Sequence, residues 1–262
     1  MHPSAVGLPY NPDFRDHRLE RRMNSTGRAL EYTDGIDTYE GYAVAPAGAA
    51  GRGPGLLVAH DWAGLHDGMK DIAERIAALG YTCLAMDVYG KGRRGTLGAD
   101  NSALMMPVVS DRARLRQRLL SGLAAIRTLP TVDAGRIGVL GYCFGGLCAL
   151  DLARAAPAGL LGAASFHGLL KPPGIEPQPR ITARTLVLHG WSDPLAPPAD
   201  VEAFGKEFTT AGADWQLHAY GHALHAFTVE SINAPETGMA YQAAAARRSW
   251  AAMTAFFAEV FA

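Results

Sequence analysis

The chain has 262 residues, and its 24 basic and 25 acidic side chains give a formal net charge of -1, which does not favour binding to nucleic acid or to an anionic membrane. Nearly half of the residues are hydrophobic, which is enough for a large core in a single α/β domain of this length. The three cysteines are too few, and odd in number, for a disulfide framework, so we expect a reducing, cytoplasmic compartment.

The first 28 residues are polar and include a basic cluster, RDHRLERR. They lack the apolar segment of a signal peptide, and no run in the chain reaches the roughly 18 apolar residues that span a bilayer. We predict an N-terminal extension over residues 1–28, either a solvated arm or an arm that binds a partner. One domain over residues 29–262 follows it.

Short apolar strands alternate with amphipathic helices along this domain. In the first helix, Ile72, Ile76 and Leu79 share one face, and Gly80 ends the helix. The predicted strands lie within residues 38–46, 53–61, 81–87, 136–140, 160–168, 185–190 and 215–220. The predicted helices lie within residues 69–80, 112–129, 145–156 and 198–212, before a final helix through Trp250, Met253, Phe257 and Val260. The alternation predicts a mostly parallel sheet covered on both faces, with functional residues just past the carboxyl ends of its strands.

Gly141, Cys143 and Gly145 form a G-x-C-x-G motif between a predicted strand and a predicted helix. The motif matches the nucleophile elbow, G-x-S-x-G, with sulfur in place of oxygen. Its turn places the thiol at a helix N-terminus, where backbone N–H groups favour a thiolate. The alternative is a buried structural cysteine, which is the expectation for Cys83 in a strand and Cys148 in a helix. A redox pair of Cys143 and Cys148 is not favoured, because their spacing is C-x4-C rather than C-x-x-C.

A candidate acid and a candidate base follow the cysteine in the order that an elbow fold requires. Asp193 lies just past one predicted strand, although an Asp before a proline is also typical of a simple turn. His225 lies in the loop after the next strand, and spacing alone leaves His222 as a second candidate base. His218, His222 and His225 do not complete a metal-ligating motif, so no metal site is predicted. The glycine-rich segment 89–100 lacks the spacing of a phosphate-binding loop, and no cofactor is predicted.

The chain resembles the dienelactone hydrolase family of α/β-hydrolases from about Leu30 to its C-terminus. The resemblance rests on AHDWAG, AMDVYGKG, GYCFGG, SFHG, LHGWSDP, HAF and AYQAAAARRSW, which occur in this order. It implies an α/β-hydrolase fold in a single domain, with a mostly parallel central sheet and helices on both faces. It also implies that Cys143 is the nucleophile, His225 the base and Asp193 the residue that orients the histidine.

The resemblance further implies an oxyanion hole made by the backbone N–H groups of Trp62 and Phe144. Asp61 falls where the family commonly has a glutamate near the resting thiol, so it is expected to modulate the nucleophile; the alternative is a carboxylate that caps its own loop. Lys91, Trp62 and Tyr142 are expected to contact the substrate.

The family's two substrate-binding arginines are replaced here. Lys91 occupies one position and offers a point charge, while Val229 occupies the other and offers none. Arg93 and Arg94 in the same loop as Lys91 are alternative sources of positive charge. We therefore expect hydrolysis of a small, neutral or weakly anionic ester or lactone through an acyl-thioester, in a monomer or small homo-oligomer. A catalytically silent protein that binds a small molecule or a partner is the alternative.

Overall fold

The computed structural model describes residues 27–262, so most of the predicted N-terminal extension lies outside the described residues, while its last residue, Arg28, begins the first strand. The eight strands of the main sheet are β1 (Arg28–Thr33), β2 (Thr38–Val44), β3 (Gly53–Ala59), β4 (Thr82–Met86), β5 (Val132–Tyr142), β6 (Leu160–Phe166), β7 (Arg184–Gly190) and β8 (Trp215–Tyr220). Their order is β1-β2-β4-β3-β5-β6-β7-β8. The β1–β2 and β2–β4 pairs are antiparallel, and every other pair is parallel.

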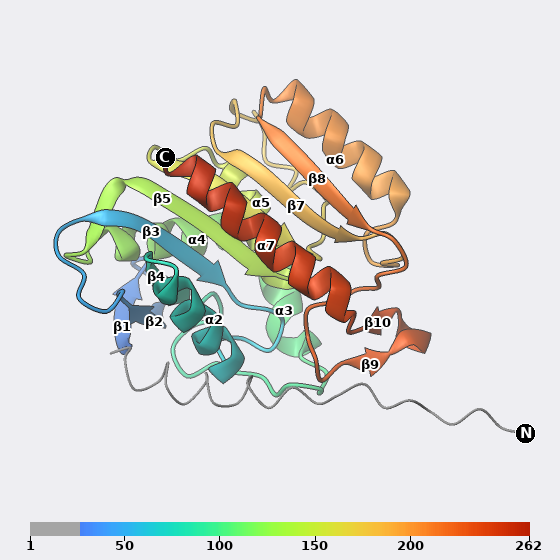
Figure 1. Cartoon of the computed structure of the whole chain (residues 1–262), viewed down its shortest axis with the longest axis horizontal. Helices are drawn as coiled ribbons and strands as arrows, with labels where there is room; N and C mark the ends of the chain where they lie inside the picture. The colour runs from blue at the N-terminus through green and yellow to red at the C-terminus, as the bar shows by residue number, and fades with distance from the viewer. Residues whose placement is uncertain (1–26) are drawn as a thin grey trace, which may run out of the picture.

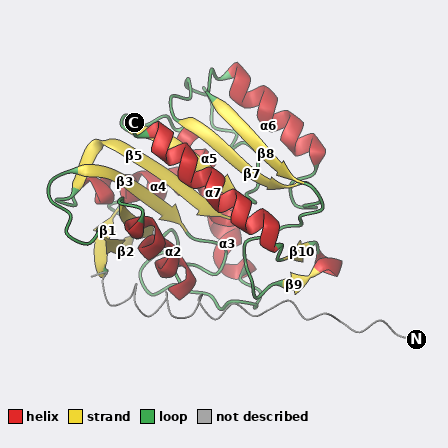
Figure 2. Cartoon of the chain, viewed as in Figure 1, coloured by secondary structure: helices red, strands yellow, loops and turns green. Residues whose placement is uncertain are grey.

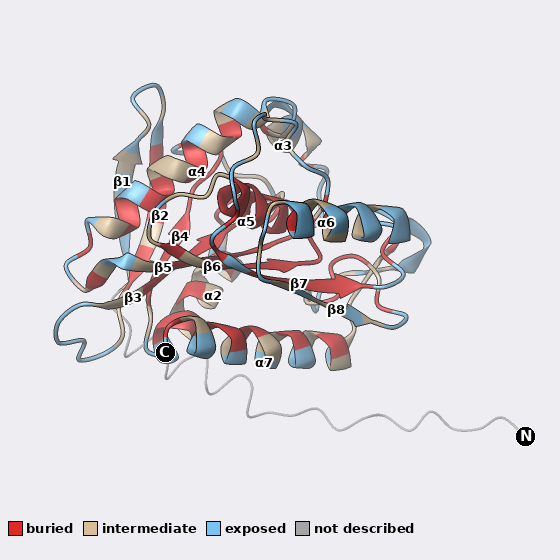
Figure 3. Ribbon diagram, turned by 90° about the horizontal axis from the view of Figure 1, so that it is seen from above, coloured by how far each residue is buried: buried red, intermediate tan, exposed pale blue. Residues whose placement is uncertain are grey.

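Helices cover both faces of this sheet, as Figures 2 and 3 show. Their bounds are α2 (Asp67–Ala78), α3 (Ser102–Val109), α4 (Arg112–Arg127), α5 (Phe144–Arg154), α6 (Pro198–Thr210) and α7 (Ala243–Val260). The buried side chains of α2 and α7 pack on one face, and those of α3, α4, α5 and α6 pack on the other. The predicted doubly covered, mostly parallel sheet is thereby confirmed. Within residues 27–262 no helix is both long enough and apolar enough to cross a bilayer.

Four elements were absent from the sequence prediction. Strand β1 is an edge strand whose side chains are mostly exposed, so it lacks an apolar pattern. Helix α3 contains a proline and buries only Val108, so it has no amphipathic stripe. Strands β9 (Asn233–Ala234) and β10 (Met239–Ala240) have two residues each, which is too short for any periodicity.

Strand β5 lies near the middle of the sheet, between β3 and β6. Gly141, near its carboxyl end, is level with Ala59 of β3 and Ser165 of β6. The segments that follow these three strands therefore start side by side. The arrowheads of β5, β7 and β8 point to the end of the sheet where β9 and β10 lie (Figure 1). This edge gathers the residues that the sequence analysis singled out.

Candidate active site

Cys143 occupies the sharp turn between β5 and α5, with φ of 55° and ψ of -114°. A positive φ strains a residue that carries a Cβ, and such strain is concentrated at functional sites. The neighbouring glycines are needed for space: a Cβ on Gly141 would lie 2.1 Å from the Gly145 carbonyl oxygen, and one on Gly145 would lie 2.1 Å from that of Ala59. This strand–turn–helix geometry is the context that the G-x-C-x-G motif requires.

His225 connects the Cys143 thiol to the Asp193 carboxylate. Its Nε2 lies 3.0 Å from Cys143 Sγ, and its Nδ1 lies 2.8 Å from Asp193 Oδ2. The other carboxylate oxygen accepts a hydrogen bond from the Leu195 N–H at 2.8 Å, which fixes the orientation of Asp193. The competing base, His222, is exposed and has a φ of 61°. The geometry brings His225, and not His222, to the thiol.

The charge state of His225 depends on these two contacts. Burial lowers the pKa of His225, but a negative charge on Cys143 and the hydrogen bond with Asp193 outweigh burial and raise this pKa to about 10. An imidazole with such a pKa keeps both ring protons at neutral pH while the sulfur is charged. A protonated imidazole at this position can stabilise negative charge on the sulfur and can donate a proton, which are the two properties that a cysteine nucleophile needs from its partner.

The backbone of His225 is held by the β9–β10 hairpin. Its N–H donates to the Gly238 carbonyl at 2.9 Å, and its carbonyl accepts from the Ala240 N–H at 3.2 Å. Two backbone bonds on one residue restrict where its ring can reach. The hairpin therefore explains how the chain selects this histidine, although its strands are too short to be recognised in the sequence.

The two predicted oxyanion donors follow β3 and β5. Phe144 is the first residue of α5, and the Trp62 carbonyl accepts a hydrogen bond from the Tyr89 hydroxyl at 3.0 Å. Within residues 27–262, the N–H groups of Trp62 and Phe144 have no backbone acceptor. Unpaired N–H groups at a helix N-terminus and beside a neighbouring strand are the donors that an oxyanion hole uses.

The profile described as "Dienelactone hydrolase family" matches residues 39–261. The chain belongs to the dienelactone hydrolase family. A solved dienelactone hydrolase-like promiscuous phosphotriesterase from metagenomic libraries superposes with a TM-score of 0.86 at 36% identity, over 91% of this chain and 100% of that chain. Among curated family relatives, the "Probable 2-oxo-3-(5-oxofuran-2-ylidene)propanoate lactonase" of a Bradyrhizobium species is 28% identical over 76% of this chain and 81% of the relative. An uncharacterized Caenorhabditis elegans protein is 37% identical over 59% of this chain and all of the relative.

Asp61 stands where the dienelactone hydrolase family commonly has a glutamate. Its Oδ1 accepts a hydrogen bond from the Ala63 N–H at 2.8 Å, and its Oδ2 lies 3.1 Å from His66 Nε2. The carboxylate thus caps its own loop, which is the alternative that the sequence left open. The described contacts do not bring Asp61 to the thiol, and its effect on the nucleophile stays a prediction.

Lys91, which the family resemblance placed at the substrate, and Arg94, an alternative source of positive charge, both have acidic partners. The Lys91 ammonium is paired with Glu31 of β1 and lies 3.9 Å from a carboxylate oxygen of Glu40 in β2. Arg94 lies 3.3 Å from Asp87 and donates to the Glu40 carbonyl. Both cations thus contact residues of the β1–β2 edge of the sheet. The geometry gives no support to Lys91 or Arg94 as a carboxylate clamp. The sequence alone did not indicate which acidic residues pair with them.

The remaining predicted substrate contacts differ in burial. Tyr142 is 5% exposed, and its ring stacks on Phe166 at 4.4 Å between centroids, so it acts here as a packing residue. Trp62 is half-buried in the loop after β3, and Val229 is half-buried in the loop after His225. The roles of Trp62 and Tyr142 toward a substrate stay predictions.

Sequence analysis missed two buried histidines that support the site. His60 Nε2 accepts a hydrogen bond from the Val88 N–H at 3.1 Å, and its Nδ1 lies 2.7 Å from the Asp61 carbonyl oxygen. Burial lowers the pKa of His60, so the ring is neutral and Nδ1 is its donor. His167 packs edge-on against His225 at 5.1 Å between centroids, and burial with the charge of His225 lowers the pKa of His167 well below its usual range. Their positions inside the AHDWAG and SFHG motifs were the available signal.

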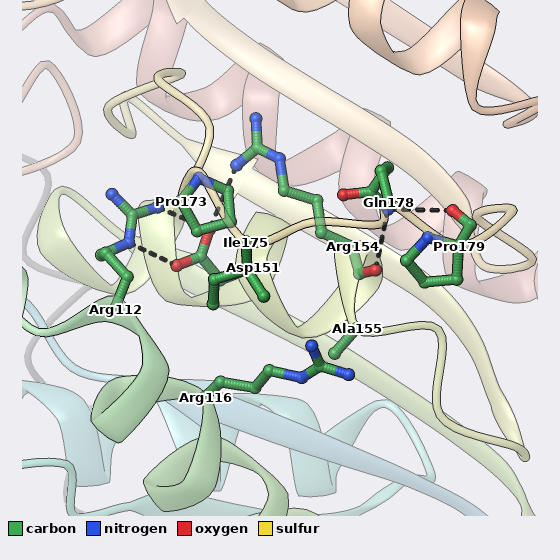
Figure 4. Close-up of a pocket in the computed structure, with 9 residues that line it drawn as sticks. All are labelled: Arg112, Arg116, Asp151, Arg154, Ala155, Pro173, Ile175, Gln178 and Pro179. Atoms are coloured by element: carbon green, nitrogen blue, oxygen red, sulfur yellow. Dashed lines mark hydrogen bonds and ion pairs between the residues drawn. The ribbon is translucent and has the colours of Figure 1, made fainter.

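A polar cleft between α4, α5 and the segment 173–179 lies apart from these residues (Figure 4). Arg112 and Arg154 both contact Asp151, and Arg154 also makes two hydrogen bonds with Glu207 of α6. The two guanidinium groups are thus balanced by two carboxylates. We assign this network the structural role of joining α5 to α4 and α6. Within residues 27–262, no group of three or more His, Cys, Asp or Glu side chains is arranged to hold a metal ion.

Proposed function

We propose that this chain hydrolyses small carboxylic esters or lactones through an acyl-thioester on Cys143, with His225 as the base and Asp193 as the residue that orients it. The observation that carries the proposal is the continuous series of contacts from sulfur to imidazole to carboxylate, at 3.0 and 2.8 Å, at the elbow of a dienelactone hydrolase family member. A catalytically silent binding protein would have no need of this charged and strained arrangement.

The reaction begins when the sulfur anion attacks the carbonyl carbon of the substrate. The N–H groups of Trp62 and Phe144 donate to the oxyanion that forms. Collapse of this intermediate breaks the carbon–oxygen bond, and His225 gives its proton to the departing alkoxide oxygen. His225 then takes a proton from water, hydroxide attacks the thioester carbonyl, and the carboxylate product leaves as the sulfur is released. Asp193 keeps the imidazole in the required orientation throughout.

The substrate class follows from the charges around this site. Val229 supplies no hydrogen-bond donor, and Lys91 is engaged by two glutamates. A substrate carboxylate would therefore lack a bidentate partner, which favours neutral or weakly anionic esters and lactones. The lactonase named above is a family relative, which supports a cyclic ester among the substrates. A reducing, cytoplasmic compartment is consistent with a nucleophile that must remain a free thiol.

Neutral phosphotriesters are a second candidate substrate class. The solved relative that carries this activity in its name is 36% identical and is covered over its whole length. A phosphotriester presents a neutral P=O group, whose oxygen becomes negatively charged when sulfur attacks. The N–H groups of Trp62 and Phe144 would donate hydrogen bonds to this oxygen. The leaving alkoxide would again take its proton from His225, and water deprotonated by His225 would then attack phosphorus, break the P–S bond and release the phosphodiester and the sulfur anion.

The test is a panel of a neutral aryl ester, a neutral lactone, an anionic lactone and an aryl phosphotriester. Wild type is compared with Cys143→Ala and with Cys148→Ala, which removes a fully buried thiol from the helix that follows Cys143. We expect Cys143→Ala to lower kcat by about four orders of magnitude, as for loss of a nucleophile that acts with its base. The Cys148→Ala protein is expected to keep most of the turnover. Hydrolysis retained by Cys143→Ala would refute the mechanism.

A further inference from the structure

His66 joins two parts of the molecule, the loop after β3 and the N-terminus of α2. Its Nδ1 accepts a hydrogen bond from the Gly68 N–H at 3.1 Å and so caps the helix. Its Nε2 lies 3.1 Å from Asp61 Oδ2, and both side chains are largely buried, with exposed fractions of 16% and 12%. Because Nδ1 accepts, the ring proton of the neutral imidazole is on Nε2, and Nε2–H donates to Asp61.

Asp61 transmits this contact to the backbone of the loop. Its Oδ1 accepts from the Ala63 N–H at 2.8 Å, and its carbonyl accepts from the Gly64 N–H at 3.2 Å. The Trp62 carbonyl is held by the Tyr89 hydroxyl at 3.0 Å. The peptide groups on both sides of the Trp62 N–H are therefore fixed. The Trp62 N–H is the group of this turn that is expected to donate a hydrogen bond to the oxyanion.

We infer that His66 is a positioning residue, which holds the Asp61 carboxylate and, through it, directs the Trp62 N–H toward the oxyanion. The inference rests on the proposed hydrolytic function. It gives Asp61 a task different from modulating the thiol, because a carboxylate bonded to Ala63 and His66 is engaged on both of its oxygens. An oxyanion donor is effective only if it is already oriented when the charge develops. A more mobile loop is therefore expected to lower kcat and to leave substrate affinity nearly unchanged.

Two substitutions separate the contacts that His66 makes. In His66→Asn, the short side chain can still accept the Gly68 N–H, since Asn is a good N-cap, but it cannot reach Asp61. In His66→Gln, the longer amide can still donate to Asp61, but Gln is a poor N-cap. If His66 acts through Asp61, then His66→Asn lowers kcat for a neutral aryl ester by about tenfold, a part of the roughly hundredfold loss on removing one oxyanion donor. His66→Gln recovers most of kcat and instead lowers the melting temperature.

A second readout distinguishes the loop from the thiol. Alkylation of Cys143 by iodoacetamide forms no oxyanion, so its rate reports the state of the sulfur alone. We expect the alkylation rate and its pH profile to be unchanged in His66→Asn. In the double variant with Asp61→Asn, kcat should fall little below that of either single variant, because both changes remove one hydrogen bond.

Each outcome decides the inference. Full kcat in His66→Asn overturns it, and so does a loss of kcat that matches a shifted alkylation profile, since the pair would then act on the thiol. A loss of kcat in His66→Gln with full kcat in His66→Asn reduces His66 to a helix cap, and equal losses in the two variants also overturn the inference, because the contact with Asp61 then does not decide the rate. These results leave the proposed function standing, provided that wild-type hydrolysis depends on Cys143. If wild type shows no hydrolysis that depends on Cys143, the proposed function and the inference both fall.

Discussion

Gly145→Ala sets two effects of opposite sign against each other at the elbow. Gly145 lies in the first turn of α5, where replacing glycine by alanine stabilises a helix by about 1 kcal/mol. Its new Cβ, however, would lie 2.1 Å from the Ala59 carbonyl oxygen and 2.6 Å from that of His60. Both contacts are with backbone, so no side chain can rotate away. Relief to an ordinary separation requires α5 to move from β3 by about 1 Å, at an overpacking cost of about 1–3 kcal/mol, so the clash wins.

The same movement separates the two predicted oxyanion donors, because Phe144 moves with α5 and Trp62 stays with the loop after β3. A displacement of about 1 Å in a reacting group can cost about a hundredfold in rate. We therefore expect kcat/KM for an aryl ester to fall about a hundredfold, while the melting temperature falls by only several degrees. Enzyme kinetics and thermal unfolding on the same samples measure the two quantities.

Gly135→Ala in the first half of β5 is the matched control. Its Cβ would lie 3.5 Å from the nearest atom, an Asp133 carboxylate oxygen, which is ordinary contact. It should leave both activity and stability near wild type. Wild-type activity in Gly145→Ala would refute the argument that the close approach of β3 and α5 sets the geometry of the site. So would a loss of activity in Gly135→Ala as large as that in Gly145→Ala.

Three further predictions concern the base and the substrate. His225→Ala should abolish turnover of an aryl ester, while His222→Ala should keep most of it; swapped results would reassign the base. Because the pKa of His225 is raised from 6.5 to about 10, its protonated form stabilises the fold fully below pH 6.5, and this stabilisation is lost as the pH rises to about 10. The melting-temperature advantage of wild type over His225→Ala should therefore shrink over that range, and an advantage that grows would contradict the charged pair. Val229→Arg should raise kcat/KM for an anionic lactone about tenfold relative to kcat/KM for its neutral methyl ester. If the ratio of these two values does not change, Val229 does not lie near the substrate carboxylate.

Sequence patterning predicted the sheet, the covering helices and the elbow because these depend on local periodicity and on small residues at a fixed spacing. The strand that ends at Tyr142 and the helix that starts at Phe144 carry their signals within a few residues. Edge strand β1 and helix α3 carry no such signal, since neither buries a continuous apolar face.

The site was predictable only where chain order constrains it. The order of Cys143, Asp193 and His225 followed from the elbow fold. Spacing alone left His222 open beside His225, the family resemblance favoured His225, and the contacts of its ring agree with that choice. The surroundings of Lys91 were not predictable, because the glutamate that pairs with it is 60 positions away. Contacts of this kind depend on which strands become neighbours, and that information is spread over the whole chain.

The proposed nucleophile and its proposed base are 82 positions apart, and the hairpin that holds His225 is made still later in synthesis. A growing chain therefore completes β5 and exposes Cys143 well before any imidazole can accept its proton. Until then the sulfur has no general base beside it, and a thiol without a neighbouring base is a weak nucleophile. On the proposed mechanism, reactivity would thus arise only when the last part of the chain has folded, and an incomplete polypeptide would be spared the oxidation and acylation expected of the finished site.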